Sequence, residues 1–446
     1  MLHINGKHSS VGIESFQSLF DSMIAAQTIA DIASECHSGR GAPPKLLTTE
    51  LIASTVYHEL QPHGTQAQHT RQLTGKQLTD GALSLRRQQL DPRVFRQVLD
   101  AALHPLADPQ QHAEAFYHEL RLLGIDGTRF CVPNTEAHED HWDKVDSRRG
   151  KSAFAQIDLA VLSELGLHNP IAAAIAQEQE SEMALARTLF PCVPPDSLTL
   201  GDRYYGVGKC VAAVIPLWLQ RGSHFLFRVR RNLKRTVLKR FRDGSARVRI
   251  QCADGTQWEV REICATVRRG KGKAVDVRLW TSLLDAREYP AAELLALYAQ
   301  RWEQELATDE LKNKLHRGHR LRSQTPETAV QEMAALVLAQ GIVARVRVKV
   351  AGAAEVPTLR VSFGKTLSEV QTLWRALQWG NGVLKPKQVR ALVEGCMESL
   401  EQQLTTRRRK RNCPRAVRQP VSSWPRLLET KSVTGPIEYA VVKIKE

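Results

Sequence analysis

The chain lacks a long hydrophobic run and a leader-like N-terminus. Its longest apolar stretches, such as "VAAVIPLWL", are far shorter than the roughly 20 residues that span a bilayer as a helix. The first residues, "MLHINGKHSSVGIESF", contain no basic segment followed by an apolar one, which is the pattern of a secretory signal. We therefore expect a cytoplasmic protein without a membrane segment.

Paired metal-binding cysteines are also missing. The eight cysteines are scattered, with no C-x-x-C motif and no Cys/His pair at zinc-finger spacing. We interpret them as reduced and mostly structural, and we expect no zinc.

Positive charge, in contrast, is abundant and concentrated in one segment. The chain has 62 Lys and Arg against 47 Asp and Glu, and residues 203–279 alone hold 19 basic against 5 acidic residues. Basic clusters bind polyanions because neutralised phosphates release condensed counterions. A membrane surface would favour a basic helix with one apolar face, and this charge is not arranged in that way. Nucleic acid is the partner that we expect.

The spacing of apolar residues divides the chain into parts. Helix-like spacing dominates the N-terminal region, short strand-like runs such as "RLLGIDGT" and "SLTLGD" follow, and the basic segment alternates at period two. Helical spacing then returns, with Thr325 and Pro326 resembling a helix start. We predict a helical N-terminal DNA-binding domain (1–120), an α/β core in two parts (121–206 and 286–350), a basic β-rich insertion (207–285) and a C-terminal helical region with a basic tail (351–446).

The stretch "YAQRWEQELATDELKNK" at residues 298–314 has an unusual polar pattern. On a regular helix Tyr298, Arg301, Glu305 and Lys312 share one narrow stripe, beside an apolar stripe that includes Trp302 and should border the core. Taken alone, an Arg and a Glu four residues apart commonly only solubilise a helix.

Two aspartates are placed where strands are expected to end. Asp126 follows "LLGI" and Asp202 follows "LTLG". Either residue could simply begin a turn. With Glu305, however, they supply three carboxylates from two strand ends and one helix, and carboxylates held at a sheet rim can share a cation.

These three segments, "GIDGTRFCVPNT", "LTLGDRYY" and "YAQRWEQELATDELK", resemble the DDE transposases of bacterial insertion sequences, specifically the insertion sequence four family. That family carries a tyrosine, arginine, glutamate and lysine signature at separations of three, four and seven, which Tyr298, Arg301, Glu305 and Lys312 match. The resemblance covers roughly residues 120 to 345.

The resemblance implies a ribonuclease-H-like, retroviral-integrase-like core. Asp126 would lie on its first strand, Asp202 after its fourth, and Glu305 on a helix reached after the insertion. Together they would hold two magnesium ions, or manganese, because hard oxygen ligands suit such ions. The implied activity is cut-and-paste transposition: nicking at the transposon end, a hairpin intermediate, and strand transfer to target DNA.

The resemblance also implies DNA contacts and an assembly. Tyr298 and Arg301 would touch phosphates beside the break, with Lys312 further along, and Trp280 or Trp258 would stack on a flipped base. Two protomers, joined in part by a C-terminal helix, would synapse two transposon ends in a nucleoid-associated complex. The basic segment adds further candidate DNA contacts, namely Arg230, Arg231, Lys234 and Arg235.

Two other functions remain open. A metal-dependent nuclease would cut DNA without joining it, and a transposase-derived DNA-binding protein would no longer cut. Inverted repeats flanking the gene would favour a mobile element over both.

Overall fold

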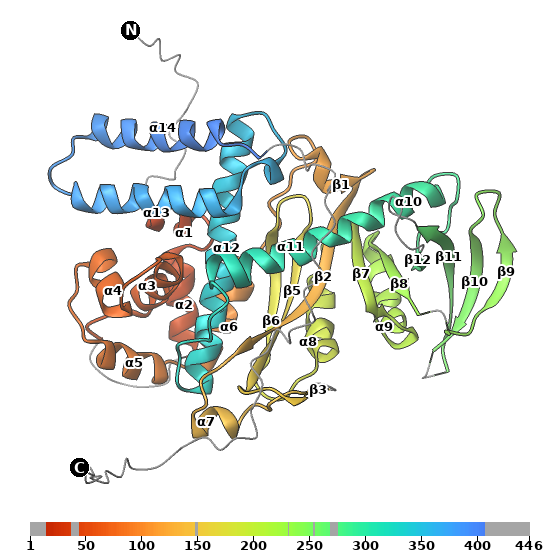
Figure 1. Cartoon of the computed structure of the whole chain (residues 1–446), viewed down its shortest axis with the longest axis horizontal. Helices are drawn as coiled ribbons and strands as arrows, with labels where there is room; N and C mark the ends of the chain where they lie inside the picture. The colour runs from red at the N-terminus through yellow and green to blue at the C-terminus, as the bar shows by residue number, and fades with distance from the viewer. Residues whose placement is uncertain are drawn as a thin grey trace, which may run out of the picture.

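The computed structural model describes residues 15–36, 44–147, 150–230, 232–252, 255–267 and 275–405. A large twisted sheet forms the centre of the molecule, and helices pack on both of its faces (Figure 1). Arg231 and the basic tail "RRRKR" lie outside the described residues.

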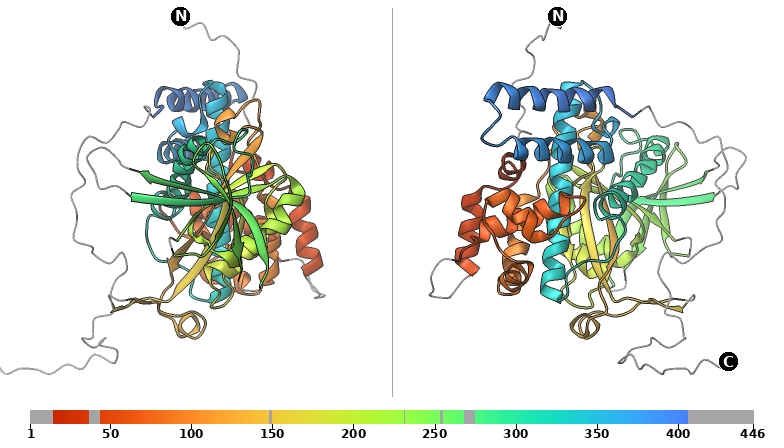
Figure 2. Two further views of the ribbon diagram at one scale, coloured as in Figure 1. Left: turned by 90° about the vertical axis from the view of Figure 1, so that its right-hand side faces the viewer. Right: turned by 60° about the vertical axis from the view of Figure 1, so that its left-hand side comes forward.

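Helices precede the sheet in the chain, as predicted. Their starts are set by N-cap side chains: Thr65, Thr79 and Asp91 each accept a hydrogen bond from a backbone N–H of the first turn. Most of these helices lie on the opposite side of the long helix α12 (Pro326–Ala353) from the sheet, as two views agree (Figures 1 and 2), whereas α6 (Pro92–Ala102) also packs against the strand β6 (Asn169–Ile175). The N-terminal helices are α1 (Phe16–Asp21), α2 (Ala26–Cys36), α3 (Thr48–Leu60), α4 (Gln66–Thr74), α5 (Asp80–Gln88) and α6 (Pro92–Ala102).

The order and direction of the strands define the core. Five strands lie side by side in the order β6-β5-β2-β7-β8. β5 runs antiparallel to β2 and β6 antiparallel to β5, whereas β7 is parallel to β2 and β8 is parallel to β7. This is the ribonuclease-H-like arrangement, so the predicted fold class is confirmed. The strands are β2 (Leu120–Cys131), β5 (Gln156–Glu164), β6 (Asn169–Ile175), β7 (Ser197–Gly206) and β8 (His224–Val229).

The basic segment extends the same sheet. Beyond β8 the order continues β12-β11-β10-β9, all antiparallel. Because β8 pairs with β7 and is reached from it through the helix α9 (Gly208–Trp218), we propose that the insertion begins after β8 rather than at residue 207. Its strands are β9 (Thr236–Arg240), β10 (Ala246–Gln251), β11 (Gln257–Val267) and β12 (Val275–Thr281).

The chain returns to the core as a nearly continuous helical rod that lies across one face of the sheet (Figure 1). This rod consists of α10 (Ala291–Tyr298), the 3₁₀ turn η4 (Ala299–Arg301), α11 (Trp302–Asp309) and the π-helical turn η5 (Glu310–Leu315). α12 follows, and its first turn is capped by Thr325 as predicted. The helices η6 (Thr358–Arg360), α13 (Phe363–Trp379) and α14 (Pro386–Gln402) complete the described chain.

Short elements fill the connections. They are η1 (Ala113–Ala115), β1 (Phe116–Tyr117), α7 (Glu136–Glu139), β3 (Asp146–Ser147), β4 (Gly150–Lys151), α8 (Glu182–Leu189), η2 (Phe190–Cys192) and η3 (Leu219–Arg221). Among the described residues, no helix is both long enough and apolar enough to cross a membrane.

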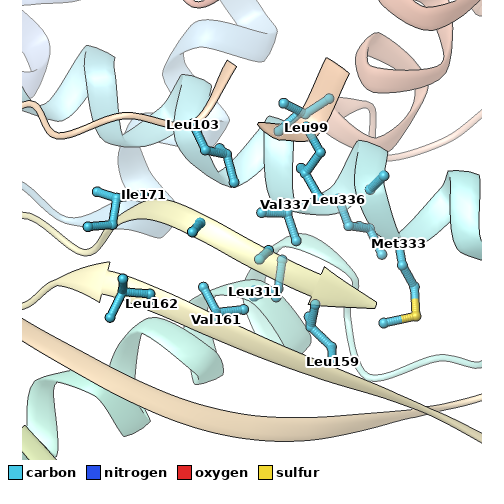
Figure 3. Packing of buried hydrophobic residues seen from close by; sticks show 14 of the residues in the cluster. Leu99, Leu103, Leu159, Val161, Leu162, Ile171, Leu311, Met333, Leu336 and Val337 are labelled. Carbon is cyan, nitrogen blue, oxygen red and sulfur yellow. The ribbon is translucent and has the colours of Figure 1, made fainter. Parts of the chain in front are cut away.

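Helix α12 fixes the sheet in place. Most of its residues are buried, and Met333 and Val337 face strand residues such as Val161 and Ile171 in one apolar layer (Figure 3). Burying each such side chain contributes about 1.5–3 kcal/mol. This packing holds β5 and β6, and through them β2, as a rigid platform.

Candidate active site

Asp126 and Asp202 lie next to each other on neighbouring parallel strands. The β2–β7 ladder runs from Arg121 opposite Ser197 to Gly124 opposite Leu200, and each aspartate is two residues beyond the last pair. The expectation that both aspartates lie at strand ends was wrong, because β2 and β7 continue past them. What ends is the pairing between the two strands, and this opens the sheet at the two carboxylates.

The helical rod brings Glu305 to the same strands. On α11 its neighbour Gln304 is buried so tightly against β2 that a Cβ at Gly124 would lie 2.8 Å from Oε1 of Gln304. Gly124 therefore permits the helix to approach the strand. Glu305 is half-buried and forms a salt bridge with Arg301, with 2.5 Å between Nη2 and Oε1.

The rod is not one regular helix, but two of the four signature side chains contact β2 and β7 directly. The hydroxyl of Tyr298 donates to the carbonyl of Gly201 on β7 (3.3 Å), and Nζ of Lys312 donates to the carbonyl of Arg129 on β2 (2.7 Å). The 3₁₀ and π turns change the angle per residue, and π turns are frequent at functional sites. The predicted stripe is therefore not a straight line on one helix, but its two ends, Tyr298 and Lys312, contact β7 and β2.

The site carries excess negative charge. Burial, and then the nearby carboxylates of Glu182 and Asp202, raise the pKa of Asp126 to about 7, although the N–H of Gly127 and Arg301 oppose this. A carboxyl in this environment favours a proton or a cation as its partner. The donor set of hard carboxylate oxygens fits a divalent cation such as magnesium.

Another acidic group is more tightly clustered than the three predicted acids. Among the described residues, the acidic and histidine side chains with three ligand atoms all within 4.8 Å are Glu59, His316 and Glu332. Glu332 already accepts hydrogen bonds from the backbone N–H groups of Arg322 and Ser323, and the Arg322 guanidinium lies 3.3 Å from Glu59. This buried group therefore has internal partners, and it joins α3 to α12 rather than forming the catalytic centre.

The predicted base-stacking tryptophan is buried. Trp280 is 1% exposed, and its Nε1 donates to Glu262 (2.9 Å) within the sheet. Its role as a surface contact is therefore corrected, because a base could reach it only if the core opened. The alternative, Trp258, is partly buried and packs against the main core. Trp302, which the helical wheel placed toward the core, is instead 45% exposed beside Arg301.

An arginine-rich groove begins next to Asp202. It has a volume of about 610 Å³ and includes five arginines, Arg203, Arg228, Arg230, Arg235 and Arg278. Arg235 and Arg278 both form salt bridges with Glu262. Lys234, which precedes Arg235, is exposed. Sequence reasoning identified Arg230 and Arg235 but missed the others, because the alternation of a strand does not reveal which arginines meet across a sheet.

A second groove, of about 480 Å³, includes Glu305 itself. Basic side chains line it as well, namely Arg129, Lys312 and Arg320, the last of which lies over the ring of Phe154. Of the two basic grooves, one therefore includes Arg203, the residue after Asp202, and the other includes Glu305.

The fold and the acids on β2, β7 and α11 define a class of protein, the ribonuclease-H-like polynucleotidyl transferases with a DDE triad. A model of the family described as "Transposase DDE domain" matches residues 117–341, and the chain belongs to this family. The resemblance found in the sequence is therefore confirmed, and the chain is a transposase-family enzyme.

Two sequence relatives and one solved structure are similar to the chain. The chain is 28% identical over 354 residues to the transposase InsG for insertion sequence element IS4 of Escherichia coli (strain K12). This match covers 76% of each of the two chains. It is 29% identical over 90 residues to the putative transposase InsZ of the same organism, which covers 20% of this chain and 30% of that protein. A cryo-EM structure of a piggyBac transposase synaptic complex with hairpin DNA is similar at a TM-score of 0.45, with 11% identity and 87% and 85% of the two chains covered.

Proposed function

We propose that the chain catalyses cut-and-paste transposition of an insertion sequence, with Asp126, Asp202 and Glu305 as its catalytic acids. The observation that carries this proposal is the placement of Asp126 and Asp202 on adjacent parallel strands where their pairing ends, with α11 packed against β2. Two magnesium ions, with manganese as a substitute, would activate the attacking hydroxyl and stabilise the departing one.

The first reaction is hydrolysis at the transposon end. Water attacks the phosphorus, the bond to the 3′ oxygen breaks, and the transposon strand keeps a free 3′-hydroxyl while the flank keeps a 5′-phosphate. That hydroxyl then attacks a phosphorus of the opposite strand and displaces the 3′ oxygen of the flank, which closes a hairpin on the transposon end. Water hydrolyses the hairpin and restores the 3′-hydroxyl, which then attacks a target phosphorus and displaces a target 3′ oxygen. The three acids align these steps, while Tyr298, Arg301 and Lys312 hold phosphates beside the break.

The basic grooves account for DNA binding in this proposal. Arg230, Lys234 and Arg235 on the insertion, together with Arg231 outside the described residues, would neutralise phosphates of the transposon end. The N-terminal helices would contribute further DNA contacts. The exposed ring of Trp302, in place of Trp280, would offer an aromatic surface for a displaced base during the hairpin step.

The active assembly would be a homodimer that holds two transposon ends in the cytoplasm, at the nucleoid. The structure gives α14 a mainly internal role, because Val393, Met397 and Leu400 are buried within the subunit, while Leu392 is 38% exposed. A contact between protomers through α14 would therefore use its exposed face.

The test is incubation with the DNA that flanks the gene, in the presence of magnesium. We expect nicked ends, hairpins and joined products in that order. Cleavage without any joined product would favour the nuclease, and binding without cleavage would favour the non-catalytic DNA-binding protein.

A further inference from the structure

The groove that includes Glu305, which we call the Glu305 groove, lies on the face of β2 that the helical rod crosses. Gly124 marks this face, because Gln304 of α11 packs against it. Asp126 and Thr128 follow Gly124 at intervals of two residues, and side chains two residues apart on a strand point to the same face. Thr128 lines the groove. The Glu305 groove therefore continues, on one face of β2, the line that begins at Asp126.

The arginine-rich groove opens on the same face of the sheet. Leu226 of β8 pairs with Leu200 of β7, and both belong to an apolar cluster with Leu294 of α10, so they face the rod. Arg228 is two residues after Leu226 and lines this groove, so its side chain also points to the face of the rod. In the order β2-β7-β8, one groove lies on β2 and the other on β7 and β8. A DNA strand that passes the two aspartates can therefore lead from one groove to the other.

Arg320 forms a cationic surface in the Glu305 groove. The side chain is exposed, and its guanidinium carbon lies 4.3 Å from the centre of the Phe154 ring. No salt bridge within the described part of the chain joins Arg320 to an acid. Asp309, which also lines the groove, accepts a hydrogen bond from Asn313 (2.7 Å). An arginine stacked on a ring can still donate its N–H groups to a phosphate oxygen.

Lys312 shows how far the groove extends from Glu305. It follows Glu305 by seven residues on the rod and lines the same groove. Seven residues of helix rise about 10 Å, which corresponds to about three base pairs of duplex at about 3.4 Å each. Nζ of Lys312 donates to the carbonyl of Arg129 (2.7 Å), so the ammonium is held at the wall of the groove. The groove is therefore long enough to hold DNA next to the break as well as the scissile phosphate.

The proposed reactions require a place for a second DNA. In the first cleavage, the phosphorus under attack joins the transposon 3′ oxygen to the flank. In strand transfer, the transposon 3′ oxygen attacks a phosphorus of the target. The acids thus have the transposon 3′ end on one side and a different DNA on the other, first the flank and later the target.

We propose that the Glu305 groove binds this second DNA through its phosphates, with Arg320 on the Phe154 ring as a contact beyond the scissile phosphate. The arginine-rich groove binds the transposon end. This inference rests on the proposed function and assigns a different DNA to each groove.

The first test compares an end that stops at the cleavage site with an end that carries a flank of about 10 base pairs, which is longer than the groove. Fluorescence anisotropy of the full chain without a divalent cation measures binding before any cleavage. We expect Arg320→Gln to weaken binding of the flanked end about 5-fold and to lower its salt slope by up to about 0.9, with the other end unaffected. Phe154→Leu should give a smaller loss. The control is Lys314→Gln, an exposed lysine of η5 outside this groove, which should bind both ends as the wild type does.

The second test supplies the target. Ends that stop at the cleavage site are joined to target DNA in magnesium, and the rate is measured against the concentration of target. Arg320→Gln should raise the KM for target about 5-fold with little change in kcat, because it removes a binding contact away from the reacting atoms. A loss with the flank alone, or with the target alone, would overturn the shared use of the groove and assign it to that DNA only.

The Asp126→Asn variant separates this inference from the function on which it rests. If Asp126→Asn still cleaves DNA, the proposed catalytic site is wrong. If the wild type cleaves and joins DNA while folded Arg320→Gln and Phe154→Leu match Lys314→Gln in both tests, only the assignment of the Glu305 groove is overturned. Circular dichroism melting establishes that each variant is folded.

Discussion

Nη2 of Arg301 lies 2.5 Å from Oε1 of Glu305, so the third of the proposed catalytic acids forms a salt bridge within its own helical rod. The same guanidinium lies near enough to Asp126 to lower its pKa. Arg301 therefore places one positive charge beside two of the proposed catalytic acids. We propose that this guanidinium contacts a phosphate when DNA is bound.

Replacing Arg301 should therefore separate cation binding from catalysis. We expect Arg301→Ala to bind Mn²⁺ about as well as the wild type or several-fold more tightly, because a competing charge is gone, while cleavage falls at least 10-fold. Mn²⁺ titration and single-turnover cleavage measure the two effects. Weaker Mn²⁺ binding would mean instead that Arg301 orients Glu305 as a ligand.

The three acids should be individually essential for cutting. Asp126→Asn, Asp202→Asn and Glu305→Gln each remove a cation ligand and little of the basic surface. We expect no detectable cleavage, with DNA affinity within about 3-fold of the wild type because the phosphate contacts remain. A gel assay for cleavage and an anisotropy titration for binding test this, and clear cutting by one variant would exclude that residue from the site.

Asp126 should make both stability and cation binding depend on pH. Its pKa is raised to about 7 in the folded chain, so between the unfolded value near 4 and pH 7 the folded state binds more protons than the unfolded state. Its contribution to stability is complete at low pH and is lost as the pH rises through about 7. We expect the melting temperature without magnesium to fall between pH 5 and 8, less so in Asp126→Asn.

Cation binding should follow the opposite trend with pH, because a cation displaces the proton of Asp126. Mn²⁺ affinity of the wild type should rise from pH 6 to 8, with proton release that calorimetry in two buffers can measure. An affinity that is flat over this range would argue that Asp126 is already ionised.

The groove arginines should set the salt dependence of DNA binding. We expect Arg203→Gln and Arg230→Gln to weaken binding to all sequences, and each to lower the slope of log affinity against log salt by up to about 0.9. Arg390→Gln, exposed on α14, is the control on a distant helix. A slope equal to that of the control would mean that the groove does not hold phosphates.

Alanine substitutions of Trp302 and Trp280 should have different effects on stability and on the reaction products. Trp302→Ala should leave stability nearly unchanged and accumulate nicked ends with little hairpin, because it removes an exposed ring beside the site. Trp280→Ala should instead destabilise the fold by about 3–5 kcal/mol, since it empties a core position. Denaturant melts and product gels distinguish these outcomes. A normal ratio of hairpin to nicked ends in Trp302→Ala would rule out its stacking role.

Much of this molecule could be predicted from local pattern. Short apolar runs predict the strands that carry Asp126 and Asp202, and the spacing of Tyr298, Arg301 and Glu305 predicts a helix face that borders the core. That this face meets the two aspartates is what the family resemblance implied. Each of these signals is contained within a short stretch of chain, so the sequence alone can reveal it.

Other features depend on contacts between distant segments. The burial of Trp280 is set by its cross-strand neighbours Phe227 and Glu262, which the period of one strand does not reveal. Glu182 reads locally as an ordinary acid in the first turn of a helix, where the helix dipole alone would favour it. Only the close approach of α8 to Gly127 shows that it packs against β2.

The unbroken sheet has a mechanical consequence. The insertion is joined to the core by the ladder between β8 and β12, so it cannot swing like a hinged lid without breaking those hydrogen bonds. Two strand spacings, about 10 Å, separate β7 from β12. The insertion therefore keeps a fixed distance from β7, and in the proposed hairpin step the bending must come from the nucleic acid.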